Sequence, residues 1–192
     1  MSGALRRSIL HGWAQTLLFL GLNRAALGAF EDVVRESPSH AEAWSVLGYL
    51  YAQAGRMSEA VPAFEKALAL RPGDAELCFN AGFAAQRAGK HVRAMELMEQ
   101  AIAVNAKLDR AWYGLGLSLA HVGRYEEAIA RFREATRLQP FNPYARYHLA
   151  AALHKLGRQE QVVKEYLRVK EFDPKVSALM RSEFGIVDPE AR

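Results

Sequence analysis

Small and apolar residues recur along this chain at a fixed distance of 34 residues. The clearest set begins after Ala41, where a tryptophan, a leucine, a glycine and a tyrosine follow one another within one or three positions. The complete set is Trp44, Leu47, Gly48, Tyr51, Gly55, Ala60, Phe64, Ala67 and Pro72. A shift of 68 residues gives the same order with one conservative change: Trp112, Leu115, Gly116, Leu119, Gly123, Ala128, Phe132, Ala135 and Pro140. Self-similarity at this period predicts a tandem array of small supersecondary units.

Each unit is predicted to be a pair of antiparallel α-helices. Apolar residues three or four positions apart form one stripe per helix, and a single pair cannot bury its apolar faces, so neighbouring pairs must stack. In the second unit the helices are expected near residues 41–54 and 58–71. We expect Gly55 to end the first helix with a positive φ and Ser58 to cap the second.

Small residues and prolines have separate expected roles in each unit. Gly48 and Ala60 are small, so the paired helices can approach closely, while larger residues such as Phe64 fill the remaining space. Prolines near the end of a unit are expected to stop the second helix, because proline disfavours helical geometry in the residue before it. These prolines are Pro38, Pro72, Pro140 and Pro174.

The periodicity predicts five consecutive repeats, without insertion, at residues 7–40, 41–74, 75–108, 109–142 and 143–176. Residues 1–6 are expected to be frayed. Residues 177–192 are expected to cap the array, with a short helix from Ser177 to Phe184 that covers the apolar face of the last repeat.

Residues 41–74 and 109–142 resemble the tetratricopeptide repeat family most closely. The positions that carry the resemblance are Trp44-x-x-Leu47-Gly48-x-x-Tyr51, then Ala60-x-x-x-Phe64, then Pro72. The resemblance extends over about 170 of the 192 residues. It implies an all-α fold, a right-handed superhelical solenoid of five helix-turn-helix repeats with a C-terminal capping helix, which forms a single domain over residues 1–192. It also implies a concave groove lined by the first helix of each repeat.

The resemblance further implies which side chains face that groove. Aromatic residues are frequent at the expected positions, and polar and basic residues surround them. The predicted partner-binding residues are Tyr49, Gln53, Phe79, Asn80, Phe83, Arg87, Arg110, Tyr113, Leu117, His121, Tyr147, His154 and Lys155.

The chemistry of these positions favours one kind of protein partner. The family's carboxylate-binding mode needs a lysine where this chain has Ser45, so no such clamp is expected. An apolar segment anchored by aromatic rings fits better, with some acidic character near Arg87, Arg110 and Lys155. The alternative for the aromatic residues is packing against neighbouring repeats. Leu18 and Phe19 leave two alternatives open, an oligomer contact or a better-packed N-terminal end.

Charge and composition exclude several other partners. Net charge is +4, but it is spread along the repeats without a basic block, which argues against nucleic acid. The single cysteine forms no internal disulfide, and no apolar run is long enough to span a membrane, so the cytoplasm is the expected compartment. Arg6 and Arg7 before an apolar stretch imitate a secretory signal, but cleavage there would cut the first repeat in half. Membrane association would therefore be indirect, through a partner.

No catalytic or metal-binding constellation is present in the sequence. His148 and His154 are six residues apart, which is not a spacing that places two ligands on one helix face. Cys78 lies on the expected buried stripe and is interpreted as an inert core thiol. We therefore expect no enzyme activity and no cofactor. The predicted function is a protein-binding scaffold or adaptor, the alternatives being a secretion-type chaperone, a structural subunit of a complex, or a self-associating array.

Overall fold

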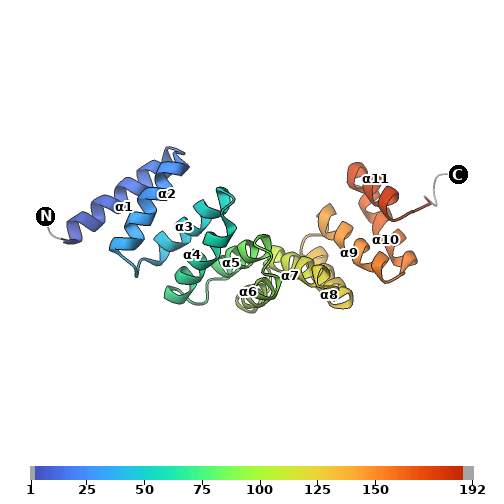
Figure 1. Ribbon diagram of the computed structural model, residues 1–192. Helices are drawn as coiled ribbons and strands as arrows, with labels where there is room; N and C mark the ends of the chain where they lie inside the picture. The colour runs from blue at the N-terminus through green and yellow to red at the C-terminus, as the bar shows by residue number, and fades with distance from the viewer. Residues whose placement is uncertain (1–2, 188–192) are drawn as a thin grey trace. The chain divides into compact units, whose positions relative to one another are not determined.

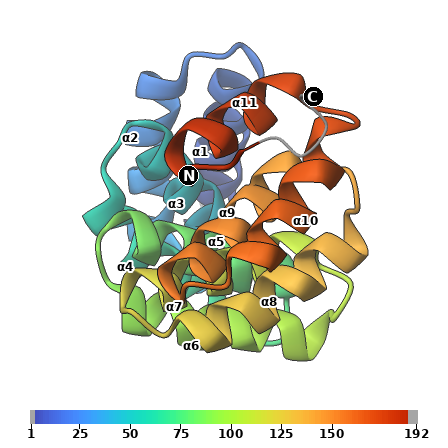
Figure 2. The same cartoon turned by 90° about the vertical axis from the view of Figure 1, so that its right-hand side faces the viewer.

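The computed structural model describes residues 3–187, and all regular secondary structure in this range is α-helical, as the sequence predicts. Figure 1 shows the helices in chain order, and Figure 2 shows the same chain turned by 90°. Within residues 3–187 there are eleven helices: α1 (Gly3–Phe19), α2 (Asn23–Glu36), α3 (Ala41–Gln53), α4 (Met57–Leu70), α5 (Ala75–Arg87), α6 (His91–Val104), α7 (Asp109–His121), α8 (Tyr125–Leu138), α9 (Pro143–Lys155), α10 (Gln159–Lys170) and α11 (Pro174–Glu183).

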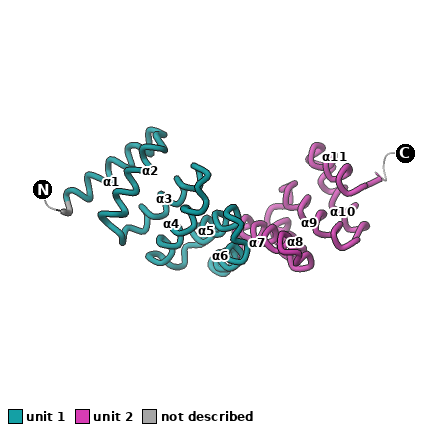
Figure 3. The backbone as a smooth tube through the Cα atoms, in the orientation of Figure 1, with its two compact units in different colours: residues 1–104 teal, residues 105–192 magenta. Residues whose placement is uncertain are grey.

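The helices form consecutive hairpins, each made of the two helices expected in one repeat. The chain divides into two compact units, residues 1–104 and residues 105–192, which Figure 3 distinguishes by colour. The first unit contains the hairpins α1–α2, α3–α4 and α5–α6. The second contains α7–α8 and α9–α10, with α11 packed against the last hairpin.

Glycines at the centre of the hairpins allow the paired helices to approach closely. A Cβ built on Gly48 would lie 2.8–2.9 Å from carbon atoms of the Phe64 ring, which is 2% exposed. In the second unit a Cβ on Gly116 would lie only 2.6 Å from the Phe132 ring. Real Cβ atoms do not approach a ring this closely, so the packing expected from Gly48 is confirmed, and the hairpin geometry depends on glycine here.

The turns between paired helices use the left-handed conformation that glycine adopts without strain. Gly55 has φ +75° and Gly123 has φ +80°, as expected for residues that follow a helix C-terminus. The repeat tryptophans also form a hydrogen bond that the sequence pattern did not reveal. Trp44 donates from Nε1 to the carbonyl of Pro38 at 2.8 Å, and Trp112 donates to the carbonyl of Ala106 at 2.9 Å.

Two expected helix boundaries are wrong. Ser58 does not cap α4, since the helix already begins at Met57 and the preceding Arg56 instead holds Glu59 through its guanidinium. Residues 3–6 were expected to be frayed, but α1 begins at Gly3; residues 1 and 2 lie outside the described range.

Pro174 was expected to stop a helix and instead begins one. The capping helix α11 starts at Pro174, three residues before the predicted Ser177, and ends at Glu183 rather than Phe184. Asp173 supplies the N-cap, because its carboxylate accepts a hydrogen bond from the amide of Val176 at 2.9 Å. Proline is well tolerated at the first helical position, where its missing N–H leaves no bond unmade.

The N-terminal hairpin has an inner and an outer apolar surface. Leu18 packs against the core formed by α1, α2 and α3. Phe19 is 89% exposed. Trp13, at the position that Leu47 occupies one repeat later, is also exposed. Leu18 therefore belongs to the packed N-terminal end, whereas Phe19 and Trp13 do not contribute to the core.

Candidate functional site

The first unit contains an apolar pocket that opens between α3 and α5, with α4 beneath it. Its volume is about 340 Å³. We call it the aromatic pocket; its lining residues are Tyr49, Ala52, Gln53, Met57, Phe64, Phe79, Asn80 and Phe83. Helical spacing explains the arrangement, since Tyr49 and Gln53 are four residues apart on α3, as are Phe79 and Phe83 on α5.

A chain of hydrogen bonds fixes one wall of the aromatic pocket. Asn23 on α2 donates to Gln53 Oε1 at 3.0 Å, and Gln53 Nε2 donates to the Tyr49 hydroxyl oxygen at 2.7 Å. The Tyr49 hydroxyl therefore accepts from Gln53 and keeps its own proton to donate. This chain holds the Tyr49 ring upright beside the pocket, which lowers the entropy lost when a ligand is bound.

The opposite wall is formed by two stacked aromatic rings. The rings of Phe79 and Phe83 lie 6.3 Å apart between centroids with an interplanar angle of 26°. Phe83 is 43% exposed and Tyr49 is 52% exposed, so both rings present apolar surface to the outside. The lining includes no charged side chain, and its polar groups are the amides of Gln53 and Asn80 and the Tyr49 hydroxyl. Such a pocket suits an uncharged apolar group whose neighbouring polar atoms accept or donate hydrogen bonds.

Five of the thirteen predicted groove residues meet in this pocket: Tyr49, Gln53, Phe79, Asn80 and Phe83. Arg87, in the last turn of α5, is exposed and is not part of the lining. Ala52 and Met57 also line the pocket, which the repeat pattern did not indicate, and so does Phe64, which was expected only as a packing residue. Met57 could have been recognised as an apolar residue at the start of α4, where the next repeat has His91.

In the second unit, the Tyr113 ring packs against other aromatic rings. It lies 6.1 Å from that of Phe132 and 5.7 Å from that of His148. Burial, followed by the nearby Tyr144, raises the pKa of Tyr113, and burial lowers the pKa of His148. His148 is therefore favoured in its neutral form. These ring contacts are of the kind expected from the packing alternative for the aromatic residues.

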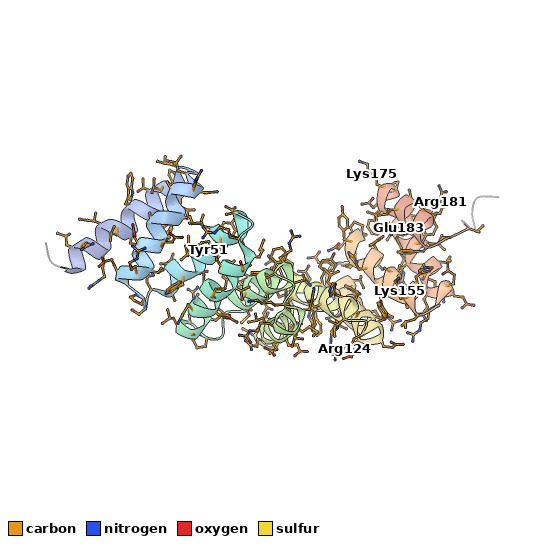
Figure 4. The ribbon with its side chains drawn as sticks, in the orientation of Figure 1. Tyr51, Arg124, Lys155, Lys175, Arg181 and Glu183 are labelled. Carbon is orange, nitrogen blue, oxygen red and sulfur yellow. The ribbon has the colours of Figure 1, made fainter. Side chains whose placement is uncertain are left out.

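Tyr147 and His154 contact the C-terminal segment. The Phe184 ring lies 5.5 Å from that of Tyr147 and 5.4 Å from that of His154. The Tyr147 hydroxyl donates to the carboxylate of Glu183, which Figure 4 labels on α11. Burial and this acidic partner raise the pKa of Tyr147 to about 12. A ligand at this position would have to displace Phe184, which the side chain of Gln159 holds by its carbonyl.

The remaining predicted residues of the second unit do not form one cluster with Tyr113. Arg110, His121 and Lys155 are exposed near the ends of α7 and α9, and Leu117 is half-buried. Lys155 is labelled at the end of α9 in Figure 4.

Other kinds of site find little support in the described residues. No group of three or more metal-ligating side chains gathers anywhere in residues 3–187. Burial, and next the charge of Asp74, raises the pKa of the Cys78 thiol, which disfavours the reactive thiolate. None of the helices described in residues 3–187 combines the length and the apolar character needed to span a bilayer.

Family models place the chain in a known repeat family. Three models described as tetratricopeptide repeat or TPR repeat match residues 11–75, 52–117 and 121–157. The chain therefore belongs to the tetratricopeptide repeat family, as its sequence pattern and helix hairpins indicate. No curated protein matches the sequence.

Solved structures of the same fold are similar along most of the chain. A crystal structure of MamA has a TM-score of 0.82 and 21% identity, over 94% of this chain and 96% of that one. MamA residues 41 to the end, from Desulfovibrio magneticus RS-1, has a TM-score of 0.81 and 22% identity, with 88% and 95% covered. YrrB, described as a TPR protein with an unusual peptide-binding site, has a TM-score of 0.80 and 20% identity, with 89% of each chain covered. At these identities the likeness concerns the fold alone.

Proposed function

We propose that this protein is a non-catalytic scaffold that binds an apolar segment of a partner protein in the aromatic pocket. The observation that carries the proposal is the gathering of Tyr49, Phe79 and Phe83 around an open volume of about 340 Å³. Two of these rings stay substantially exposed, although the core of the first unit is complete without them. Aromatic side chains at the centre of a protein interface are frequent binding hot spots.

The lining also indicates the composition of the bound segment. Because no charged side chain lines the pocket, an apolar side chain such as leucine, methionine or phenylalanine would enter it at the lowest desolvation cost. Asn80 and the Tyr49 hydroxyl stand beside this anchor and can bond to the backbone of the partner. The peptide-binding site described for YrrB supports a peptide ligand for a protein of this fold. The proposed compartment is the cytoplasm, and neither nucleic acid nor a cofactor is part of the proposal.

Peptide display against the full chain tests this function. Selected peptides should carry one apolar anchor residue, and Phe83→Ala should weaken their binding by about 2 kcal/mol, roughly thirtyfold in Kd. Tyr144→Ala is the matched control, because Tyr144 is an exposed aromatic residue, at 61%, outside the pocket. Equal loss in both variants, or none in Phe83→Ala, would show that the aromatic pocket is not the binding site. Circular dichroism must show that both variants keep the wild-type helix content.

One observation favours a second candidate, a structural subunit within a larger assembly. Leu5, Ile9 and Trp13 lie four residues apart on α1 and are all more than half exposed, which makes a continuous apolar stripe. Trp13→Ser would then disrupt the assembly without affecting peptide capture. Light scattering of wild type and variant across a concentration series separates this role from the scaffold role.

A further inference from the structure

A second pocket, in the other unit and of opposite character, lies among α8, α9 and α10. Its volume is about 290 Å³. We call it the basic pocket; its lining residues are Arg133, Leu149, Leu153, Gln161, Lys164, Glu165 and Arg168. Leu149 and Leu153 are one turn apart on α9 and almost fully buried, so they form its floor. The four residues from α10 share one helix face, because they are spaced by three, four and seven positions.

The single carboxylate of the basic pocket is already neutralised. Glu165 Oε2 accepts from Arg146 Nη1 at 2.7 Å, and Glu165 Oε1 accepts from Arg168 Nη1 at 2.6 Å. The Glu165 side chain is 9% exposed. The Arg133 guanidinium donates to the neutral amide of Gln161 at 3.1 Å and has no carboxylate partner within residues 3–187. Lys164 stands beside it with no carboxylate partner among the described residues. The pocket therefore holds an excess of positive charge.

The same place in the first unit carries the opposite charges. Two periods earlier, at a shift of 68 residues, Arg133, Gln161 and Lys164 correspond to Glu65, Arg93 and Glu96. There, Arg93 forms ion pairs with Glu65 and with Glu96, each at 2.7 Å. The pair with Glu65 links α4 to α6, and the pair with Glu96 lies within α6, so the cation of this group has two carboxylate partners. The second unit keeps the contact between helices, as Arg133 to Gln161, but replaces both acids by bases.

The buried side of the basic pocket also departs from the repeat. Arg146 and Glu165 correspond, at the same shift, to Cys78 and Leu97, both of which are buried in the first unit. The first unit therefore has two apolar residues where the second unit has an ion pair. Replacing a buried ion pair by apolar residues of similar size is often neutral or stabilising. Packing therefore does not require Glu165. Besides pairing with Arg146, Glu165 fixes the Arg168 guanidinium at the edge of the basic pocket.

We propose that the basic pocket binds a phosphate group, with Arg133, Lys164 and Arg168 as its ligands and Glu165 as a positioning residue. Since Arg146 alone balances the charge of Glu165, the other three cations suit an anion that carries two charges. Arginine guanidinium groups present planar pairs of N–H donors that match the oxygens of phosphate, and lysine adds a point charge. The Leu149 and Leu153 floor excludes water from one side, which strengthens the ion pairs. The phosphate can belong to a small phosphate ester or to a phosphorylated side chain.

The triple variant Arg133→Glu, Gln161→Arg, Lys164→Glu tests the proposal. The variant places the ion-pairing residues of the first unit at the corresponding positions of the second unit, so it should fold as the wild type does. Its net charge is lower by three. The matched control is Lys175→Glu, Arg181→Gln, which lowers the net charge by the same three units. Both of its residues lie on α11 and are labelled in Figure 4, and α11 contributes no residue to the basic pocket.

Titration with inorganic phosphate at constant ionic strength, followed by amide NMR shifts, provides the readout. Wild type and control should saturate, with the shifts centred on α8 and α10. The triple variant should bind phosphate at least about tenfold more weakly than the wild type. Failure of the wild type to saturate overturns the proposal, as does equal binding by the triple variant or equal loss in the control. Acetate binding as tight as phosphate would also overturn it.

Two further ligands distinguish the sources of the phosphate. Glycerol 3-phosphate represents a small ester, and a phosphoserine peptide represents a modified partner; the tighter of the two identifies the source. An unphosphorylated peptide of the same sequence must bind more weakly at this pocket, and equal binding would refute the assignment. If the protein does not bind phosphate, the proposed peptide binding in the aromatic pocket still stands, because the two pockets lie in different units.

Discussion

Substitution of Gly48 by alanine probes the close approach on which each hairpin depends. The added Cβ would lie 2.8–2.9 Å from the Phe64 ring, and Phe64 is 2% exposed, so the ring has no free space to enter. Overpacking of this kind costs about 1–3 kcal/mol. Alanine recovers about 0.5–1 kcal/mol, because glycine is unfavourable within a helix. The central values give an expected net loss of about 1 kcal/mol of unfolding free energy.

Two other glycines of the same unit serve as internal standards. A Cβ on Gly28 meets nothing within 4 Å, so Gly28→Ala should stabilise by about 0.5–1 kcal/mol. A Cβ on Gly82 would lie 3.2 Å from the methyl group of Met98, which can move aside, and 3.3 Å from Leu97 Cβ, so both contacts are looser than those at Gly48. Gly82→Ala should therefore be close to neutral, between the other two.

Urea denaturation of the three variants, followed by circular dichroism, gives the comparison. The predicted order of stability is Gly28→Ala, then Gly82→Ala, then Gly48→Ala, with the wild type near the middle variant. Helix propensity alone would make all three variants more stable than the wild type. If Gly48→Ala is as stable as Gly28→Ala, glycine at position 48 is not required for packing, and the reasoning about the hairpins is wrong.

Two more predictions concern buried and hydrogen-bonded groups. Arg146→Ala leaves the buried Glu165 without one of its two arginine partners and should cost about 3–5 kcal/mol, whereas Arg146→Cys with Glu165→Leu, the residues of the first unit, should be neutral or stabilising in urea denaturation. A loss in the double variant as large as in Arg146→Ala would contradict this. Burial and the hydrogen bond to Glu31 raise the pKa of Tyr51 to about 12, so this phenol stays neutral in the folded protein at a pH where it ionises in the unfolded chain. Its contribution to stability is therefore present below pH 10 and is lost as the pH rises toward about 12. Tyr51, labelled in Figure 4, should account for tyrosinate absorbance that appears near pH 12 and is missing in Tyr51→Phe; a missing component near pH 10 would refute this.

The repeat pattern predicted the helices well because it records packing constraints at fixed spacing. Gly48, Gly55 and Phe64 each lie where their size and backbone freedom suggested. The boundaries were predicted less well where one residue has two possible roles. Pro174 lies one period after Pro140 and so was expected to stop a helix, but α10 ends early and the same proline begins α11. Sequence spacing does not determine which of two adjacent helices includes such a proline.

The sequence indicated the part of the aromatic pocket that is formed by the first helices of two repeats, α3 and α5. Tyr49, Phe79 and Phe83 meet as the family resemblance implies. Tyr113 occupies the corresponding type of position but packs against Phe132 and His148, because a histidine on α9 completes an aromatic cluster there. The 34-residue pattern does not predict this histidine, because the other repeats have no histidine at the same position. The basic pocket was missed as well, since net charge by segment conceals a local exchange of acids for bases.

The central claim, that the aromatic pocket holds an apolar segment of a partner, is tested most directly by intermolecular NOE contacts in a complex with a selected peptide. We predict contacts from one apolar side chain of the peptide to the ring protons of Tyr49, Phe79 and Phe83 and to the methyl group of Met57. Contacts confined to α1 or to helices α7–α11, with none to these rings, would contradict it.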